Sequence, residues 1–232
     1  MKSIYSSITE KKRQGKKSLA ILLDPDKTEN LQNLIGRLKK IKPDYIFVGG
    51  SLVQQNQLHS LIKNLKQHCH SPVILFPGNH NQISPEADAL LFLSLISGRN
   101  PEYLIGQHVI AAPLLSRTSL EIIPTAYMLI ENGKTTSVEY ISQTKPIPRD
   151  KTDIALATAL AGEMLGLKML YLEAGSGAKH AVPKKMIRLL AKNLKIPIMV
   201  GGGIKNKKQL KKMYEAGADM VIIGTAFEKN DF

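Results

Sequence analysis

The chain has 232 residues, of which 43% are hydrophobic, so it can bury a sizeable core and general intrinsic disorder is excluded. No apolar run reaches the ~18 residues that a membrane-spanning helix needs, and the N-terminal residues lack the apolar core of a secretory signal. The single cysteine, Cys69, excludes an internal disulfide, and we expect a reducing cytoplasm.

The formal net charge is +13, carried by lysines that are scattered over many predicted helices. No basic run is interleaved with aromatic residues, so we expect no nucleic-acid partner. Solvated helix faces explain most of this charge. The rest fits attraction of anionic substrates or of an anionic membrane surface.

Short apolar runs bounded by turn residues predict buried parallel strands over residues 18–23, 45–48, 73–76, 89–93 and 125–130. Amphipathic or Ala-rich segments predict helices over residues 29–40, 55–68, 107–119 and 153–165. The segment between the third and fourth strands is short and contains Pro85, so the third helix is predicted to be missing or vestigial. The polar connection 131–150 is the longest in the chain and is a candidate substrate-side loop.

Three further apolar runs end in glycine turns, over residues 169–177, 198–203 and 220–225. They bring the strands to eight. Strand, glycine loop and helix, repeated at the end of a chain of this length, predict an α/β fold, the (β/α)8 TIM barrel, with its phosphate site. No linker is evident, so we expect residues 1–232 to form a single domain.

The three glycine turns are expected to converge on one phosphate, because glycine lets backbone N–H groups approach an anion closely. One such turn alone would be a plain tight turn, but three follow consecutive strands. The residues concerned are Gly175, Ser176, Gly177, Gly201, Gly202, Gly203, Gly224 and Thr225.

Asp24 and Asp26 flank a proline directly after the first strand, and carboxylates at a strand end suit Mg²⁺. Asp26 or Thr28 could instead cap the next helix. Ser51 follows the second strand, where it could be a weak hydroxyl ligand or a helix cap.

Glu173 ends the sixth strand beside the phosphate loop and is a candidate general base; its alternative role is a salt bridge with a loop lysine such as Lys179. Tyr171 could line the same pocket or fill the barrel. His80, His108 and His180 are expected on the surface or in loops, and Glu228 and Lys229 are expected to cap or decorate the last helix.

Six motifs, in this order and spacing, resemble geranylgeranylglyceryl phosphate synthases and the similar bacterial heptaprenylglyceryl phosphate synthases. They are LDPDK at 23–27, VGGS at 48–51, FPGN at 76–79, YLEAGSGA at 171–178, GGGI at 201–204 and GTA at 224–226. The resemblance implies a barrel without a regular third helix. It also implies a Mg²⁺-dependent prenyltransferase that joins sn-glycerol 1-phosphate to geranylgeranyl diphosphate through an ether bond and releases diphosphate.

The resemblance further assigns roles to residues. Mg²⁺ would be held by Asp24 and Ser51, and Glu173 would take the proton of the attacking hydroxyl. The glycerol phosphate would contact Tyr171, Leu172, Glu173, Ala174, Gly175, Ser176, Gly177, Gly201, Gly202, Gly203, Gly224 and Thr225. An apolar groove must hold the prenyl tail, with Leu22, Phe76, Leu95, Ile96 and Tyr127 as candidates.

Leu22 departs from the heptaprenyl relatives, which have a phosphate-contacting lysine there, and this favours the geranylgeranyl branch. Family members form dimers and larger assemblies, so a homo-oligomer (dimer or hexamer) is expected, with peripheral membrane contact during product release. Two other hypotheses remain open. One is a phosphate-binding barrel isomerase or lyase of sugar or amino-acid metabolism, and the other is a lipid-binding barrel without turnover.

Overall fold

The computed structural model describes residues 3–28, 30–51, 53, 57–229 and 231–232. Eight strands form its centre: β1 (Ser18–Leu23), β2 (Tyr45–Val48), β3 (Val73–Leu75), β4 (Ala89–Leu95), β5 (Glu121–Leu129), β6 (Met169–Glu173), β7 (Ile198–Gly201) and β8 (Met220–Ile223). Around them lie α1 (Ile4–Arg13), α2 (Leu31–Ile41), α3 (Leu58–His68), α4 (Gln107–Leu115), α5 (Ser137–Ser142), α6 (Thr152–Met164), α7 (Lys184–Asn193), α8 (Lys207–Ala216) and α9 (Thr225–Glu228). Two single turns complete the chain, η1 (Pro25–Lys27) and η2 (Glu102–Gly106).

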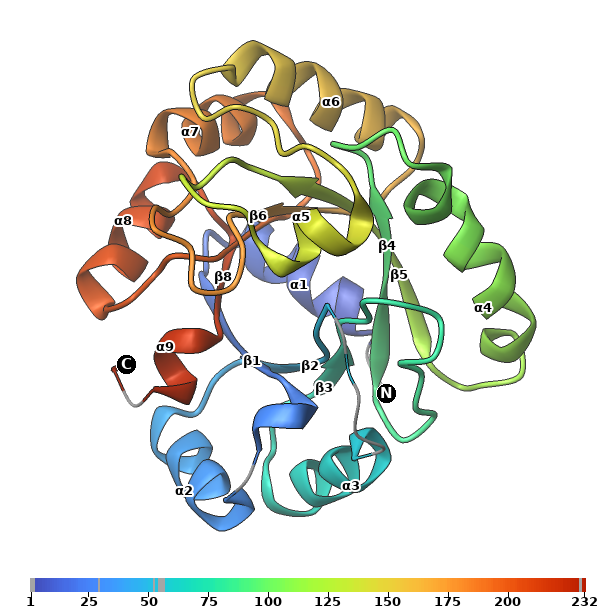
Figure 1. Ribbon diagram of the computed structural model, residues 1–232. Helices are drawn as coiled ribbons and strands as arrows, with labels where there is room; N and C mark the ends of the chain where they lie inside the picture. The colour runs from blue at the N-terminus through green and yellow to red at the C-terminus, as the bar shows by residue number, and fades with distance from the viewer. Residues whose placement is uncertain (1–2, 29, 52, 54–56, 230) are drawn as a thin grey trace.

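The strands pair in chain order, all parallel, and β8 pairs with β1 to close the barrel. Helices ring this barrel, with α5 in front of one open end and α1 behind the other (Figure 1). The predicted (β/α)8 barrel is therefore confirmed. Two predicted helix starts, at residues 29 and 55, lie outside the described residues.

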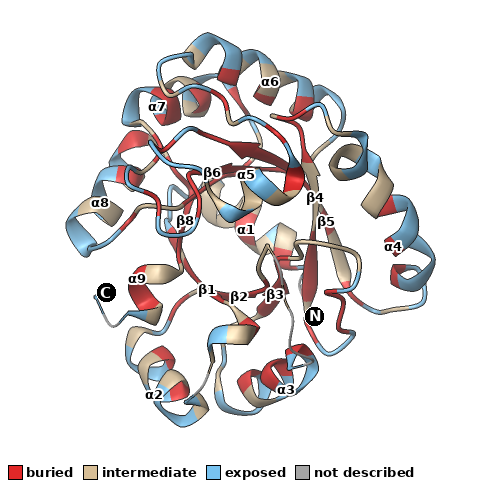
Figure 2. Ribbon diagram, in the orientation of Figure 1, coloured by how far each residue is buried: buried red, intermediate tan, exposed pale blue. Residues whose placement is uncertain are grey.

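Two apolar layers hold the barrel together, and the strands contribute to both because their side chains alternate between the two faces. Phe47, Ile74 and Ile222 fill the interior, whereas Val48 and Leu75 pack outward against the helices. Figure 2 shows the strands as mostly buried, with intermediate residues in β1, β4 and β5. Since both faces are covered, the strands read as apolar runs in the sequence.

Helix α1 closes the amino-terminal end of the barrel, where Ile4 and Ile8 pack on the interior cluster. Glu121, at the start of β5, holds the first turn of this helix. Its carboxylate accepts the N–H groups of Ile4 at 2.6 Å and Tyr5 at 2.9 Å, and the hydroxyl of Ser3 at 2.6 Å. Helix α1 thus covers the amino-terminal end of the barrel and leaves the carboxyl-terminal end accessible for a functional site.

The segment between β3 and β4, residues 76–88, contains no helix, as predicted. The connection 131–150 carries the short helix α5. Two other boundaries differ from expectation: β5 begins at Glu121, four positions before the predicted start, and the helix predicted over 107–119 ends at Leu115. Among the described residues, no helix is both long and apolar enough to cross a membrane.

Candidate active site

A polar cavity of about 460 Å³ lies at the carboxyl ends of the strands. The glycine turns after β6, β7 and β8 meet there, as predicted for a phosphate site. The predicted residues that line it are Asp24, Ser51, Tyr171, Glu173, Gly175, Ser176, Gly177, Gly202, Gly203, Gly224 and Thr225. Three others do not line it: Leu172 and Ala174 are buried in the layer beneath the helices, and Gly201 lies in β7 behind Tyr171.

Glycine is required at two of these positions by close packing. A Cβ on Gly202, whose φ is +82°, would lie 2.6 Å from the backbone nitrogen of Gly175. A Cβ on Gly201 would lie 2.2 Å from the hydroxyl oxygen of Tyr171. The turns after β6 and β7 therefore touch through their backbones, which concentrates N–H donors in one corner of the cavity.

Glu173 ends β6 at the floor of this cavity and is 6% exposed. Its Oε1 accepts the N–H of Gly175 at 2.5 Å, and its carboxylate also accepts the hydroxyl of Tyr171. Burial raises the pKa of Glu173 above its ordinary value, although these two hydrogen bonds oppose the rise. A carboxylate held in this way is oriented and made more basic, as a proton acceptor requires.

Asp24 lies at the end of β1, on the cavity wall opposite the glycine turns of β6. Its Oδ1 accepts the N–H of Asp26 at 3.2 Å, and its Oδ2 lies 2.7 Å from the ammonium of Lys27. A Cβ on Gly50 would lie 3.5 Å from the Asp24 carboxylate, so the end of β2, with Ser51, packs beside it. Asp26 is not among the residues that line the cavity.

These donors fit Mg²⁺, which takes hard oxygen ligands and keeps waters and substrate phosphates in its shell. Asp24 offers a carboxylate and Ser51 a hydroxyl, side by side on one cavity wall. Among the described residues, no group of three or more Asp, Glu, His or Cys side chains could enclose a metal. A metal held here would take the rest of its shell from water and substrate oxygens.

An apolar groove of about 90 Å³ opens beside the polar cavity, in the space left by the missing helix between β3 and β4. Its walls are β4 and α4, with α5 above. Phe76, Leu95 and Tyr127, three of the predicted groove residues, line it. The residues that line it further include Leu91, Leu93, Tyr103, Ala111, Leu115, Val138 and Ile141.

Two of the five groove predictions lie elsewhere. Leu22 lines the polar cavity, and Ile96 packs in the layer beneath the helices. Phe76 and Tyr127 line both spaces, and their rings are 5.8 Å apart, edge to face. The Tyr171 ring lies 5.2 Å from Phe76 and 5.4 Å from Tyr127, so this aromatic cluster joins groove and cavity.

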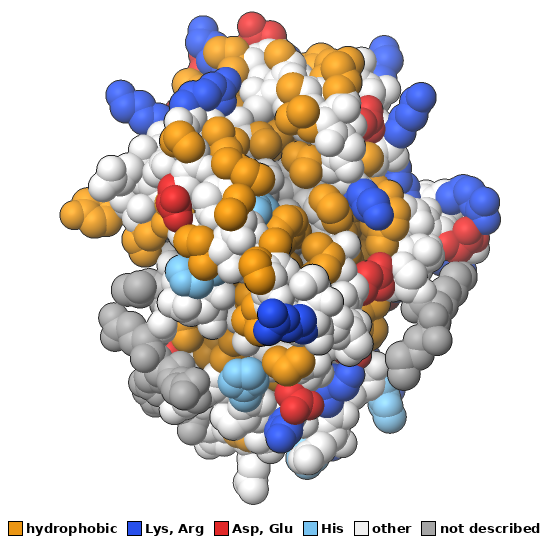
Figure 3. All heavy atoms as spheres, turned by 90° about the vertical axis from the view of Figure 1, so that its right-hand side faces the viewer, with side chains coloured by type: hydrophobic (Ala, Val, Ile, Leu, Met, Phe, Trp, Pro, Cys, Tyr) orange, Lys and Arg blue, Asp and Glu red, His pale blue; other side chains and the backbone are white. Residues whose placement is uncertain are grey.

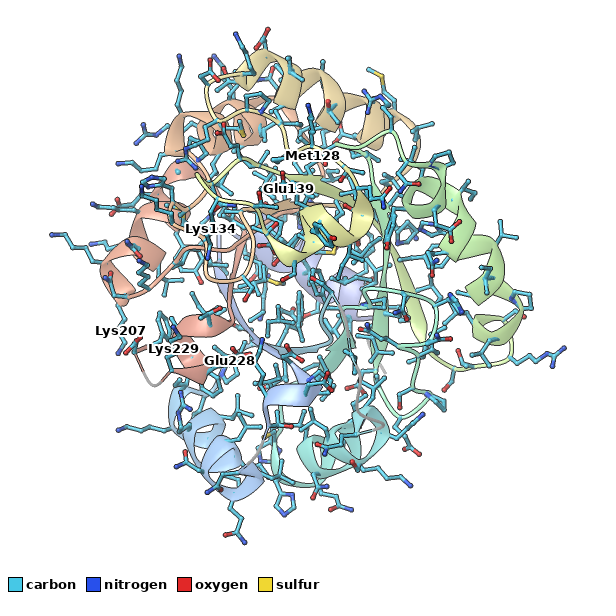
Figure 4. The ribbon with its side chains drawn as sticks, viewed as in Figure 1. Met128, Lys134, Glu139, Lys207, Glu228 and Lys229 are labelled. Atoms are coloured by element: carbon cyan, nitrogen blue, oxygen red, sulfur yellow. The ribbon has the colours of Figure 1, made fainter. Side chains whose placement is uncertain are left out.

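His108 differs from expectation, and two residues of the last helix contribute to the cavity as well. His108 is not on the surface: it is 6% exposed on α4, its ring is 4.2 Å from Phe92, and burial lowers its pKa. Glu228 belongs to α9 and Lys229 is its C-cap, as expected, and both also line the polar cavity. Figure 4 labels the two residues beside α9. Only closure of the barrel places α9 beside the end of β1.

Lys27 also lines the polar cavity, and no role was predicted for it. The sequence held one usable signal, since a lysine three positions after Asp24, across a proline turn, can reach back to the carboxylate.

The chain was compared with known proteins. A family model described as the PcrB family matches residues 9–231. A protein named geranylgeranylglyceryl phosphate synthase from Flavobacterium johnsoniae is 55% identical over 230 residues, covering 98% of this chain and 95% of that protein. One of the same name from Chitinophaga pinensis is 49% identical, covering 97% and 90%. The crystal structure of (S)-3-O-geranylgeranylglyceryl phosphate synthase from Thermoplasma acidophilum, in complex with its substrate sn-glycerol-1-phosphate, matches with a TM-score of 0.93 and 34% identity, covering 99% and 93%.

Proposed function

Because this chain belongs to the PcrB family, we propose that it is a Mg²⁺-dependent geranylgeranylglyceryl phosphate synthase. The reaction joins sn-glycerol 1-phosphate to geranylgeranyl diphosphate through an ether bond and releases diphosphate. One observation carries the assignment within this fold: a polar cavity with a phosphate corner opens into an apolar groove at Phe76 and Tyr127. An isomerase or lyase of small phosphorylated substrates has no use for such a groove.

The glycine turns after β6, β7 and β8 hold the glycerol phosphate. Their backbone N–H groups and the hydroxyls of Ser176 and Thr225, which are 3.0 Å apart, surround the phosphate corner. This support comes from elements that the barrel fixes, so the glycerol hydroxyl is held at a constant position. Gly175 also donates to Glu173, which places the proton acceptor beside the bound substrate.

Glu173 accepts the proton of the attacking hydroxyl while that oxygen bonds to the allylic carbon of the prenyl chain. The carbon–oxygen bond to diphosphate breaks, and the leaving group takes the electron pair. Tyr171 donates a hydrogen bond to Glu173 and so keeps the carboxylate turned toward the cavity. Asp24 and Ser51 would hold Mg²⁺, which would neutralise negative charge on the diphosphate.

The apolar groove holds the prenyl tail. Burial of each CH₂ group contributes ~0.8 kcal/mol, so a groove of this kind favours long chains over short ones. Its walls are apolar along β4 and α4, and Tyr103 and His108 bring polar atoms into them.

Turnover with defined donors tests the proposal. Radiolabelled sn-glycerol 1-phosphate is incubated with C15, C20 or C35 prenyl diphosphate, with Mg²⁺ or with EDTA. We expect a lipid-soluble product with Mg²⁺, most rapidly from the C20 donor, and none with EDTA. If a folded protein binds glycerol phosphate and forms no product with any donor, the synthase proposal is wrong.

We also propose that the protein is a homo-oligomer in the cytoplasm, a compartment that its single cysteine suits. Large apolar side chains on one outer face support the oligomer. They belong to η2 and α4 (Ile105, Val109, Ile110 and Leu114) and to α6 (Ile154, Met164 and Leu165). Figure 3 views the α4 side of the molecule, where apolar side chains gather over the surface.

Peripheral contact with an anionic bilayer is the last part of the proposal, and the net charge of +13 supports it. Co-sedimentation with vesicles tests it at low salt. We expect binding to vesicles that contain anionic lipid and no binding to neutral vesicles. A protein that binds neither kind of vesicle contradicts the proposed membrane contact.

A further inference from the structure

Lys27 lines the polar cavity and contacts two carboxylates there. It ends the turn η1, and its ammonium lies 2.7 Å from Asp24 Oδ2 and 3.9 Å from Glu228 Oε2. The lysine side chain is 53% exposed, whereas that of Asp24 is 19% exposed. The ammonium therefore sits at the surface of the cavity, against a carboxylate that is mostly buried.

The oxygen that faces Lys27 is the one that a metal would use. Asp24 Oδ1 accepts the backbone N–H of Asp26, whereas Oδ2 faces the lysine. A divalent cation on Oδ2 and an ammonium at 2.7 Å from the same oxygen would repel each other strongly. The lysine stem is a flexible four-carbon chain, so its ammonium can move while Asp24 stays in place.

We propose that Lys27 is an exchangeable counter-ion of Asp24: its ammonium neutralises the carboxylate until a divalent cation binds there, and it then moves onto the incoming diphosphate. This inference rests on the metal site proposed above. Among the ion pairs of the described residues, Lys27 is the partner that reaches Asp24, and its second contact, Glu228, draws the ammonium toward α9.

The diphosphate, rather than the glycerol phosphate, is the expected partner of the released ammonium. The glycerol phosphate has its own donors in the backbone of the glycine turns. In the proposed reaction the diphosphate would lie beside Asp24 and Ser51, which line the cavity, and a single divalent cation would leave part of its negative charge unpaired. Lys27 lies beside this wall of the cavity and is able to pair with that charge.

The proposal predicts effects of opposite sign in one variant. In Lys27→Met, the affinity of the free protein for Mn²⁺, measured by electron paramagnetic resonance without substrate, should rise about three- to tenfold, because a competing cation is gone. The affinity for inorganic diphosphate with Mg²⁺, measured by calorimetry, should fall about tenfold or more, because a charge-assisted hydrogen bond is lost. Binding of glycerol 1-phosphate should stay unchanged.

Lys211→Met is the matched control. It removes the same charge and a helical ion pair, with Glu215 at 3.9 Å, on the exposed face of α8. We expect no change in any of the three affinities. Lys27→Arg, which keeps the charge, should bind diphosphate with an affinity close to the wild-type value. This variant is measured in place of Lys27→Met if Lys27→Met does not fold.

A purely structural Lys27 would leave Mn²⁺ and diphosphate binding unchanged in Lys27→Met, and that result overturns the inference. Weaker Mn²⁺ binding, or a loss confined to glycerol 1-phosphate, also overturns it. The outcome is separable from that of the proposed function. If the wild type turns over normally with Mg²⁺ but Lys27→Met gives one of these contrary results, only the counter-ion role is wrong. If the wild type shows no turnover, the synthase proposal is wrong.

Discussion

Glu173 is the residue on which the proposed proton transfer depends. Its carboxylate is buried, accepts two hydrogen bonds from Gly175 and Tyr171, and has a raised pKa because burial disfavours the charged form. The position is therefore a strict test of the mechanism.

Glu173→Gln keeps the shape of the side chain and an acceptor for the Gly175 N–H, but removes the base. We expect kcat to fall about 100- to 10,000-fold, while the KM for glycerol phosphate changes little. Single-substrate kinetics with the C20 donor measure both. Glu215→Gln, on the exposed face of α8, should match the wild type. If Glu173→Gln loses less than threefold in kcat, Glu173 is not the base.

Helix α4 is the element that gives the groove its depth. Ala111 is 7% exposed and lines the groove, whereas its neighbour Ala112 is exposed and does not line it. Ala111→Phe should fill part of the groove and reduce turnover of the C20 donor about tenfold or more relative to C10, because long chains lose their apolar contacts. Ala112→Phe is the control, and equal losses for both donors would contradict the assigned groove.

Helix α1 is the element that depends most on a single distant carboxylate. Glu121 accepts the first N–H groups of the helix, as a capping residue does, although it lies in β5. Glu121→Ala should lower the free energy of unfolding by about 1–2 kcal/mol. Urea unfolding measures this change, with Glu86→Ala, an exposed surface pair of Lys63, as the control. An unchanged midpoint would show that Ile4 and Ile8 alone hold α1.

At the scale of the whole molecule, the apolar face of η2, α4 and α6 is the feature that the single chain leaves uncovered. Val109 is 64% exposed and Leu114 54% exposed on one helix, which is costly for an isolated barrel in water. Wild-type protein should elute with a mass that is a multiple of the single chain. Val109→Glu should shift it toward the monomer in light scattering, and Gln67→Glu on α3 should not. A monomeric wild type contradicts the oligomer.

The sequence by itself determined the strands, the absence of a helix between β3 and β4, and the glycine turns after β6, β7 and β8. These features are local, since apolar runs report burial on both faces and glycines report backbone approach to an anion. It also placed Asp24 and Glu173 at strand ends, where a barrel assembles its site.

Only the tertiary structure decided which distant residues meet. Lys27 and Glu228 lie near opposite ends of the chain and come within 3.9 Å because β8 pairs with β1. His108 is buried because β4 packs against α4, and Phe76 meets Tyr127 where groove and cavity join. Such contacts depend on closure of the barrel and on side-chain packing, which no spacing along the chain encodes.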